Sequence, residues 1–317
     1  MERLRVGIVG GRRRRQGLGP FVVRFLNQAG AEIGGLVGTR EDTLDSAIAD
    51  LKTRYGIEAR GYLTLEALLE AESPTALAIL SPANTHQGYL DAALEAGLHV
   101  LCEKPFVWGI DTLAETSRRI VRGFRARRLR LRENCPWPYT LPAYERLHPG
   151  ALSRGVGRFE MLLSPVSTGV QMLGDAMPHA LSLLQAIAPG EKVTLGQIHY
   201  STRASDAPEV TVAFRFLSDG REVESEVRLL RQERQPREAG YGVDGCWAKR
   251  TVRMEDYALF FGDGGRTVEV PDPLELLVAD FVNDLGDAAA GDDERRGAEI
   301  IQRMLLLDQL TRAYEGS

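Results

Sequence analysis

The sequence predicts an α/β domain with a doubly wound parallel sheet, followed by an α+β domain with an open, mostly antiparallel sheet. Residues 4–103 alternate short apolar runs with helical segments, which is typical of parallel strands covered on both faces. Later segments alternate polar and apolar residues, as antiparallel strands with one covered face do. The length of 317 residues suits two domains. We therefore expect domains at 1–131 and 132–317.

The first domain opens with a strand, a helix and a second strand. Residues 4–9 are apolar and stop at Gly10-Gly11, Pro20 suits the first turn of a helix that ends at Gly30, and residues 31–37 form the next apolar run. The segment 4–38 has about the length of one βαβ unit. The pattern then predicts helices at 42–55, 65–72 and 87–96 and strands at 75–80 and 99–102.

The second domain follows a proline-rich stretch after residue 131, where Pro136, Pro138, Pro142 and Pro149 lie close together. Alternating segments predict strands at 155–163, 193–201, 209–217 and 222–230. The last segments predict helices at 273–290 and 292–314.

Composition excludes several classes of protein. The net charge of -5 argues against a nucleic-acid partner, and no segment is apolar enough to cross a membrane. The N-terminal residues do not have the pattern of a secretory signal, so we expect a soluble protein of the cytoplasm. Three scattered cysteines predict neither a disulfide framework nor a metal site.

The turn after the first strand is a candidate phosphate loop, because backbone N–H groups and a helix N-terminus attract an anion there. The spacing G-x-G-x-x-G from Gly10 would need glycines at 12 and 15, where arginines stand. The loop is therefore expected to be extended, with its binding residues Gly10, Gly11, Arg12, Gly17 and Gly19. The arginines could grip phosphate, or the loop could simply be solvated.

The second strand ends in Gly38-Thr39-Arg40, without the carboxylate that usually meets the ribose of NAD. A hydroxyl followed by a guanidinium suits a 2′-phosphate, so Thr39 and Arg40 predict NADP, with NAD as the alternative. The alternative role for Arg40 is stacking on adenine.

Two further strand ends carry candidate cofactor-binding residues, because open α/β sheets bind ligands at the carboxyl ends of their strands. The first is Ser81-Pro82-Ala83-Asn84-Thr85-His86, with candidates Ser81, Pro82, Asn84 and His86. The second is Glu103-Lys104-Pro105, whose lysine is one of only four among 39 basic residues.

Together with Asp175-Ala-Met-Pro-His179, these motifs resemble the Gfo/Idh/MocA family of glucose-fructose oxidoreductase, inositol dehydrogenase and rhizopine catabolism. The likeness covers residues 4–110 and 170–185. It implies an N-terminal Rossmann domain and a C-terminal sheet that covers the nicotinamide. It also implies that 132–317 is the substrate and oligomerisation domain of a homodimer or homotetramer.

The resemblance gives roles to single residues. Lys104 matches the lysine of the E-K-P motif, which contacts the reacting oxygen, and Pro105 matches its often cis proline. Asp175 and His179 match the first aspartate and the histidine of D-x-G-x-H-x-x-D. Two positions depart from that motif, namely Met177 for its glycine and Ser182 for its last aspartate.

These roles suit the chemistry of hydride transfer. Lys104 would stabilise a developing alkoxide, and His179 would exchange the proton as general acid or base. Asp175 would orient the imidazole or bind a substrate hydroxyl. The alternative for His179 is a core or cap histidine at a helix start near Pro178.

Asn134 and Trp137 are candidate substrate contacts at the crossing between domains, and hinge packing is the alternative for Trp137. The predicted function is an NAD(P)-dependent oxidoreductase acting on a hydroxyl or carbonyl of a sugar, cyclitol or similar small polyol. Two alternatives remain: NAD-dependent glycoside cleavage without net redox change, and a non-catalytic dinucleotide sensor or scaffold.

Overall fold

The computed structural model describes residues 4–11, 18–286 and 293–316. The chain divides into two compact units, residues 1–134 with 274–301 and residues 135–273 with 302–317. Residues 274–301, which the expected limits place in the second domain, thus group with the first unit. The division into folding domains at 1–131 and 132–317 stays a prediction, because compactness alone does not show which segments fold together.

The first unit contains a six-stranded sheet in the order β3-β2-β1-β4-β5-β6, with every neighbouring pair parallel. Its strands are β1 (Arg5–Val9), β2 (Glu32–Val37), β3 (Arg60–Tyr62), β4 (Ala76–Ile79), β5 (His99–Glu103) and β6 (Leu131–Asn134). This is the strand order of a dinucleotide-binding sheet, whose direction of winding switches between β1 and β4. The predicted doubly wound parallel sheet is confirmed.

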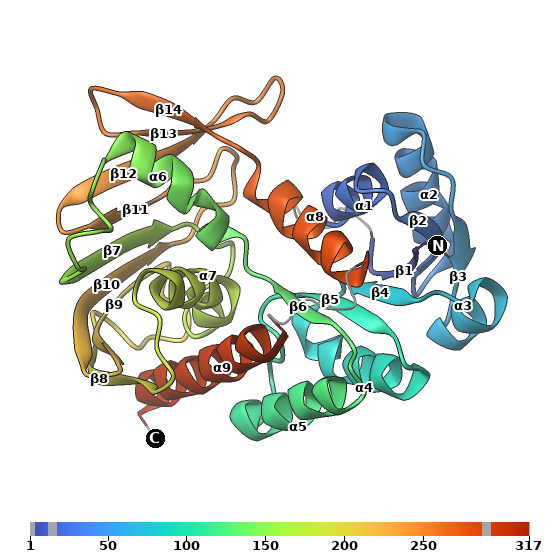
Figure 1. The fold of residues 1–317 in the computed structure, drawn as a ribbon, viewed down its shortest axis with the longest axis horizontal. Helices are drawn as coiled ribbons and strands as arrows, with labels where there is room; N and C mark the ends of the chain where they lie inside the picture. Colours follow the sequence, from blue (N-terminus) through green and yellow to red (C-terminus); the bar gives the residue numbers. More distant parts are fainter. Residues whose placement is uncertain (1–3, 12–17, 287–292, 317) are drawn as a thin grey trace. The chain divides into compact units, whose positions relative to one another are not determined.

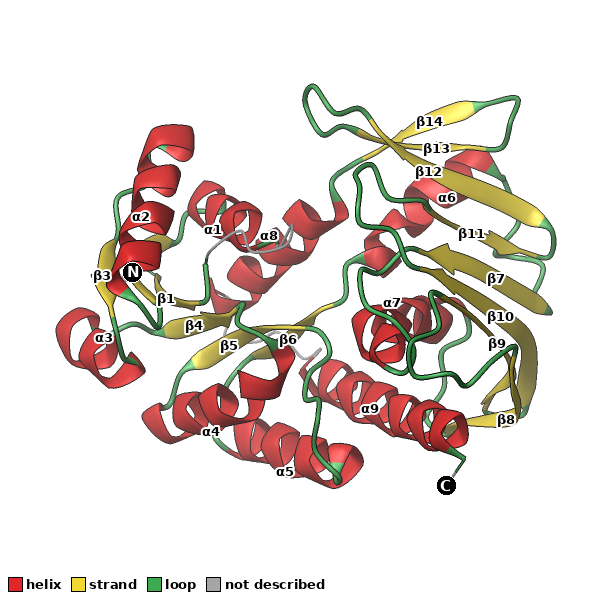
Figure 2. Ribbon diagram, turned by 180° about the vertical axis from the view of Figure 1, so that it is seen from behind, coloured by secondary structure: helices red, strands yellow, loops and turns green. Residues whose placement is uncertain are grey.

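Helices cover both faces of this sheet, with α1 and α8 on one side and α4 and α5 on the other (Figures 1 and 2). The helices of the first unit, with a 3-10 turn after β4, are α1 (Gly19–Gln28), α2 (Glu41–Tyr55), α3 (Leu65–Glu72), η1 (Ala83–Thr85), α4 (His86–Ala96), α5 (Leu113–Ala126) and α8 (Pro273–Gly286). The final helix α9 (Asp293–Glu315) begins in this unit and ends in the second. Among the described residues, no helix is long and apolar enough to cross a membrane.

The second unit contains an eight-stranded sheet in the order β14-β13-β12-β11-β7-β10-β9-β8. The pair β7–β10 is parallel and the other neighbours are antiparallel. The strands are β7 (Arg158–Leu163), β8 (Val193–Tyr200), β9 (Glu209–Ser218), β10 (Arg221–Leu230), β11 (Ala239–Val243), β12 (Cys246–Val252), β13 (Leu259–Gly262) and β14 (Thr267–Val270). The predicted open, mostly antiparallel sheet is confirmed.

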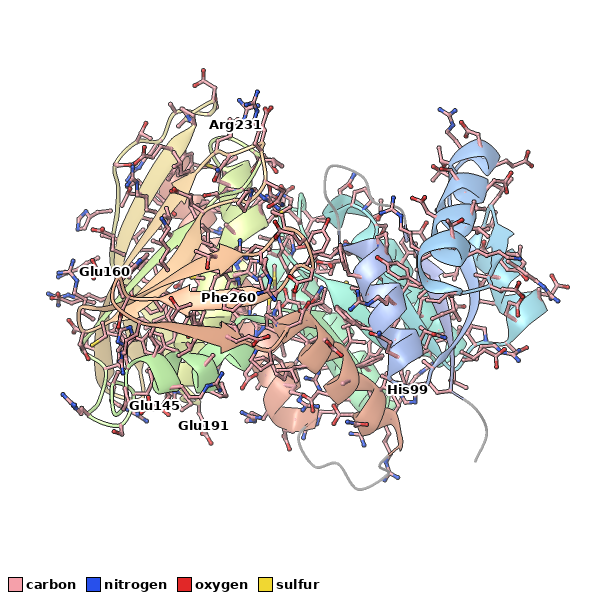
Figure 3. The ribbon with its side chains drawn as sticks, turned by 90° about the horizontal axis from the view of Figure 1, so that it is seen from above. His99, Glu145, Glu160, Glu191, Arg231 and Phe260 are labelled. Carbon is pink, nitrogen blue, oxygen red and sulfur yellow. The ribbon has the colours of Figure 1, made fainter. Side chains whose placement is uncertain are left out.

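One face of this sheet is covered and the other is bare (Figures 1 and 2). The 3-10 turn η2 (Trp137–Thr140) and the helices α6 (Leu141–Leu147) and α7 (Gln171–Ile187) lie on the covered face, and the end of α9 hydrogen-bonds to β8. Side chains of β10 alternate between buried and exposed, and those of β9 between buried and half-buried, as the sequence pattern predicts. Glu160 of β7 projects from the bare face (Figure 3).

Candidate active site

Glycines bring three backbones together at the switch point of the parallel sheet. Gly10 follows β1 with φ +80°, and a Cβ there would lie 2.7 Å from the backbone of Ser81 after β4. A Cβ on Gly19, the first residue of α1, would lie 3.0 Å from the carbonyl of Gly11. A side chain at Gly10 would clash with the Ser81 backbone, and one at Gly19 would make an unusually tight contact. Leu18 offers α1 no side-chain cap, so the first N–H groups of this helix suit an anion such as a pyrophosphate.

The predicted phosphate-loop residues divide between described and undescribed positions. Gly10, Gly11 and Gly19 lie together at the switch point, as their candidate role requires. Arg12 and Gly17 lie outside the described residues.

Thr39 and Arg40 are exposed between β2 and α2. Arg40 binds the Asp42 carboxylate through two hydrogen bonds, Nε to Oδ1 at 3.0 Å and Nη2 to Oδ2 at 2.5 Å. The two side chains are 70% and 61% exposed, so the pair contributes little to stability and can exchange partners. A 2′-phosphate at Arg40 would therefore compete with Asp42, which the sequence pattern does not single out.

His86 joins the loops that follow β4 and β5. It is fully buried, and its Nδ1 and Nε2 atoms lie 2.9 Å from the carbonyl oxygens of Pro105 and Ser81. A ring N–H can donate to either carbonyl, and the tautomer decides which nitrogen carries the proton. This contact positions the loop that carries Lys104. A direct contact of His86 with a dinucleotide stays a prediction.

The Glu103-Lys104-Pro105 segment is also fixed by β6. Asn134 Nδ2 donates to Glu103 Oε1 at 2.7 Å, and Glu133 Oε1 accepts from the N–H of Phe106 at 3.0 Å. Burial raises the pKa of the Glu103 carboxyl, against the opposing effects of the Lys104 ammonium and the Asn134 amide. Lys104 itself is half-buried at this strand end.

Asn134 offers a further group to a bound molecule. Its Oδ1 atom is buried and accepts no hydrogen bond from the described part of the chain. Such a buried acceptor is costly unless it meets a donor. An amide N–H₂ group, such as the one a nicotinamide carries, would satisfy it. The prediction of Asn134 as a substrate contact is untested, and its observed partner is Glu103.

Ser81, Pro82 and Asn84 lie in the turn after β4. The Ser81 hydroxyl is 2.7 Å from Thr85 Oγ1, which also donates to the Pro82 carbonyl at 2.7 Å. Pro82 and Asn84 are exposed. The turn therefore presents a backbone that is braced internally, beside the Gly10 position.

In the second unit, α7 carries Asp175 and His179 one turn apart. Both are half-buried on a helix whose other residues are mostly buried. Gln171, one turn before Asp175, is exposed, so the three residues lie along the same side of the helix. Residues four apart lie on the same helix face, so a substrate group could meet both. The alternative that placed a helix start near Pro178 is wrong, because α7 begins at Gln171 and Pro178 lies inside it.

The two departures from the family motif take structural roles. Met177 is fully buried in the core. Ser182 Oγ donates to the carbonyl of His179 at 2.8 Å, within the helix. Neither change removes Asp175 or His179 from the exposed side of α7. Lys104 belongs to the first unit and His179 to the second, so their pairing across a reacting oxygen stays a prediction.

Asp175 is held by polar neighbours that sequence reasoning missed. Ser167 donates a hydrogen bond to Asp175 Oδ2. The Asp175 carboxylate raises the pKa of Arg237, against the larger lowering by burial. Glu133 was missed as well. A signal existed for Glu133, since the run Arg132-Glu133-Asn134 puts three polar residues in a row in a strand of a covered sheet. No comparable signal exists for Arg237, which precedes β11 by two residues.

Trp137 is 7% exposed and packs on the covered face of the sheet. Its ring meets Tyr241 edge-on at 6.0 Å between centroids, and the Arg250 guanidinium lies 5.7 Å from its centroid. Packing within the second unit is thus observed, and both the hinge role and a substrate contact stay predictions.

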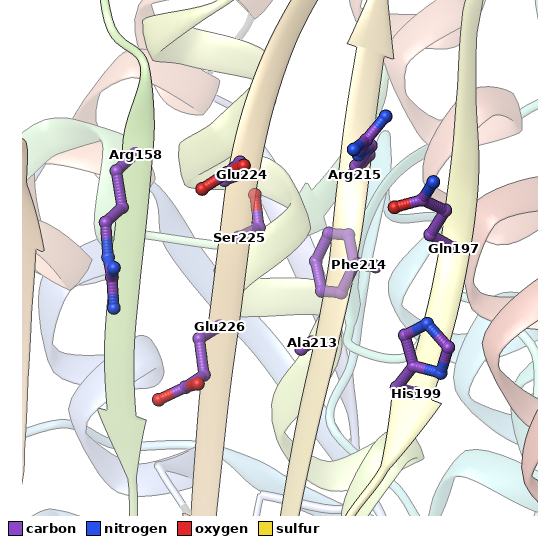
Figure 4. Close-up of a pocket in the computed structure, with 9 residues that line it drawn as sticks. All are labelled: Arg158, Gln197, His199, Ala213, Phe214, Arg215, Glu224, Ser225 and Glu226. Carbon is purple, nitrogen blue, oxygen red and sulfur yellow. The ribbon is translucent and has the colours of Figure 1, made fainter.

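A hollow on the bare face of the sheet has a different character. Exposed charged side chains surround it (Figure 4), and none of the predicted site residues lines it. It is bounded by Arg158, Gln197, His199, Ala213, Phe214, Arg215, Glu224, Ser225 and Glu226.

Comparison with known sequences supports the site in the first unit. Residues 4–131 match the model of an oxidoreductase family with an NAD-binding Rossmann fold, Gfo/Idh/MocA. D-xylose 1-dehydrogenase (NADP(+)) 2 of Haloferax volcanii is 36% identical over 90 residues, which are 27% of this chain and 26% of the relative. UDP-N-acetylglucosamine 3-dehydrogenase of Acidithiobacillus ferrooxidans is 25% identical over 207 residues, which are 62% and 60%. The matches thus span less than two thirds of these relatives' own length.

Comparison with solved structures extends the likeness in fold to the whole chain. A 3-ketoreductase from Actinomadura kijaniata in complex with NADP has a TM-score of 0.70 at 19% identity, with 98% of this chain and 97% of that chain covered. The UDP-N-acetylglucosamine 3-dehydrogenase structure from Acidithiobacillus ferrooxidans has a TM-score of 0.66 at 20% identity, with 99% of each covered. At these identities the likeness shows the fold. The matched strands, the glycine turn and the E-K-P segment together identify residues 4–131 as an NAD-binding Rossmann fold of the Gfo/Idh/MocA oxidoreductase family.

Proposed function

We propose that this protein is an NAD(P)-dependent oxidoreductase that acts on a hydroxyl or carbonyl carbon of a sugar, cyclitol or similar small polyol. The observation that carries the proposal is the segment of Lys104, which is fixed by His86, Glu133 and Asn134 at the same sheet edge as the glycine turn. The names of the relatives, dehydrogenases of xylose and of a UDP-sugar, support the substrate class.

The bound dinucleotide supplies or accepts the hydride. The residues of the chain handle the charge and the proton. Lys104 stabilises negative charge on the substrate oxygen, His179 exchanges the proton, and Asp175 binds a neighbouring hydroxyl or orients the imidazole.

The experiment combines binding and turnover. We expect NADPH or NADH to bind the purified protein in a fluorescence titration, and a panel of sugars and cyclitols to give turnover at the reduced-nicotinamide absorbance band. Lys104→Met and His179→Asn should lower kcat by about 100-fold or more while the dinucleotide still binds. Lys52→Met and His199→Asn are matched controls, since both residues lie outside the proposed site.

Two outcomes would overturn the proposal. Absence of dinucleotide binding would exclude the oxidoreductase. Turnover of a glycoside without net change in reduced cofactor would favour transient oxidation during glycoside cleavage.

We propose NADP as the preferred cofactor, through Thr39 and Arg40. The exposed carboxylate of Asp42 competes for the same guanidinium. Asp42→Asn should therefore increase the affinity for NADPH relative to NADH, and Arg40→Ala should decrease it, each by about three- to tenfold. Asp45→Asn, another exposed carboxylate on α2, is the control. Equal ratios in all three variants would argue for a different 2′-phosphate contact.

We propose a cytoplasmic location and a homo-oligomer, a dimer or tetramer, formed through the bare face of the eight-stranded sheet. The cysteines Cys102, Cys135 and Cys246 are all free thiols, which suits a reducing compartment. An open sheet face without helices is a surface that a second copy can cover.

A further inference from the structure

Two arginines lie side by side on the covered face of the second unit. Arg250 of β12 pairs with Ala239 and Phe261 on the neighbouring strands, and both of these are buried. Arg250 Nη2 donates to the carbonyl of Arg237 at 3.1 Å. Arg237 Nη1 in turn donates to the carbonyl of Ser164 at 3.3 Å.

The charges of this pair are poorly balanced. Burial, with a contribution from the Arg237 guanidinium, lowers the pKa of Arg250 to about 10. Burial also lowers the pKa of Arg237, and the Asp175 carboxylate opposes that effect. Both guanidinium groups stay charged at neutral pH, and the Asp175 carboxylate acts on the pKa of Arg237 but not on that of Arg250. Both side chains are half-buried, and a like-charge pair that is partly withdrawn from water becomes more favourable when an anion accompanies it.

The hydrogen-bonding groups of the cluster are also incompletely used. Arg250 Nε and Ser164 Oγ are both buried, and neither has a hydrogen-bond partner within the described ranges. By contrast, Arg253 at the end of the same strand region binds Asp256 through two hydrogen bonds at the surface. Arg250 therefore keeps an N–H donor and a positive charge that no described group of the chain satisfies.

We infer that Arg237 and Arg250 form an anion-binding site beside Asp175, which takes a phosphate or carboxylate group of the substrate. A guanidinium matches two oxygens of either group, and the Ser164 hydroxyl can add a donor. The Asp175 carboxylate repels a second anion next to it and accepts a hydrogen bond from a substrate hydroxyl instead. The site thus selects a polyol that carries an acidic substituent. The claim that this acidic polyol is the substrate rests on the proposed function.

The arrangement argues against a purely structural role for the pair. The two hydrogen bonds to backbone carbonyls need only N–H donors, which a glutamine would supply without a charge. The positive charge of Arg250 adds a desolvation cost that packing on Trp137 only partly offsets. An anion recovers that cost at the moment of binding.

The test is an anion titration without cofactor, read by tryptophan fluorescence because Arg250 lies over Trp137. The probes are inorganic pyrophosphate, glucuronate and glucose at constant ionic strength. We expect saturable binding of at least one of the two anions and none of neutral glucose. Pyrophosphate alone would identify a phosphate-bearing substrate, and glucuronate alone a carboxylate-bearing one.

Variants then locate the site. Arg250→Gln and Arg237→Gln should weaken anion binding by about tenfold or more, and Lys249→Gln, an exposed cation on the adjacent residue, should leave it unchanged. Calorimetry on Trp137→Phe measures anion binding without the fluorescence signal. We expect this variant to keep its anion affinity, because the Trp137 ring gives the signal and does not bind the anion.

Wild-type protein that binds neither anion overturns the inference, and so does folded Arg250→Gln with wild-type anion affinity. If Arg250→Gln fails to fold by circular dichroism, Arg237→Gln decides alone. Because the titration contains no dinucleotide, failure of cofactor binding leaves its result intact.

Discussion

Burial and two polar neighbours, Lys104 and Asn134, have opposing effects on the pKa of the Glu103 carboxyl. Burial raises its pKa above the ordinary value of 4.5, while Lys104 and Asn134 pull it down less strongly. A carboxyl with a raised folded pKa stabilises the fold most when it is protonated. That contribution is present below the unfolded pKa and is lost as the pH rises through the folded pKa.

We therefore expect Glu103→Gln to gain stability relative to the wild type as the pH rises above about 4.5, the ordinary pKa of a glutamate. The glutamine keeps an oxygen for Asn134 and removes the buried charge. Urea unfolding at several pH values between about 4 and about 8 measures the difference. The control is Glu58→Gln, whose lowered pKa beside Lys52 gives a small effect of the opposite sign. A difference that does not change with pH would contradict the expectation.

The Lys104 segment shows which features the sequence predicts and which it does not. The position of Lys104 at a strand end follows from an apolar run that stops, which is local information. The partners of its loop do not, because His86 lies 19 residues from Pro105 and Glu133 lies 27 residues from Phe106. Parallel pairing of β4, β5 and β6 creates these contacts. The pattern of one strand does not contain them.

Strand β6 depends on charged partners from the end of the chain. Arg132 is 8% exposed, and it donates to Asp280 at 2.9 Å and to Asp284 of α8. Arg296 of α9 binds the same two carboxylates. This network ties α8 and the start of α9 to the edge of the parallel sheet, and it explains why residues 274–301 group with the first unit.

Removing one arginine of this network should be costly. We expect Arg132→Met to lower the free energy of unfolding by about 3 kcal/mol, the low end for a broken buried ion pair, because Arg296 still faces both carboxylates. Arg60→Met is the control, since its side chain is 76% exposed and its loss should cost about 0.5 kcal/mol or less. Guanidinium unfolding checks both. A loss as small as that of the control would show that Arg296 alone neutralises the pair.

Among whole elements, those with a clear period were predictable and those without it were not. The strands β8, β9 and β10 alternate along their sequence and were predicted to within one residue at each end. Strand β11 is buried throughout and shows no alternation, so it was missed. Helix α7 was missed because Gly174 and Pro178 look like helix breakers. Pro178 nonetheless lies inside the helix, where it has no N–H to donate to the carbonyl of Gly174.

At the scale of the whole molecule, the main surface feature is the bare face of the eight-stranded sheet, which is strongly charged. Its exposed ladder includes Glu222, Glu224 and Glu226 on β10, with arginines on the neighbouring strands. Arg215 lies 3.0 Å from Glu222, and Arg228 lies 2.7 Å from Glu209. In a two-fold interface each patch meets its own copy, so carboxylates of one subunit must face arginines of the other. An interface built this way depends on charge more than on apolar contact.

The proposed homo-oligomer should therefore dissociate in salt. At 1 M salt the screening length falls to about 3 Å, which removes most attraction between exposed charges. We expect light scattering coupled to size exclusion to give the oligomer mass at low salt and a mass shifted toward the monomer at 1 M. Glu224→Lys combined with Glu226→Lys should give the same shift at low salt, because it places like charges opposite one another, whereas Glu70→Lys on α3 should not. A mass that neither salt nor the double variant changes would place the interface on another surface, and the charged ladder would then face solvent in the assembled protein.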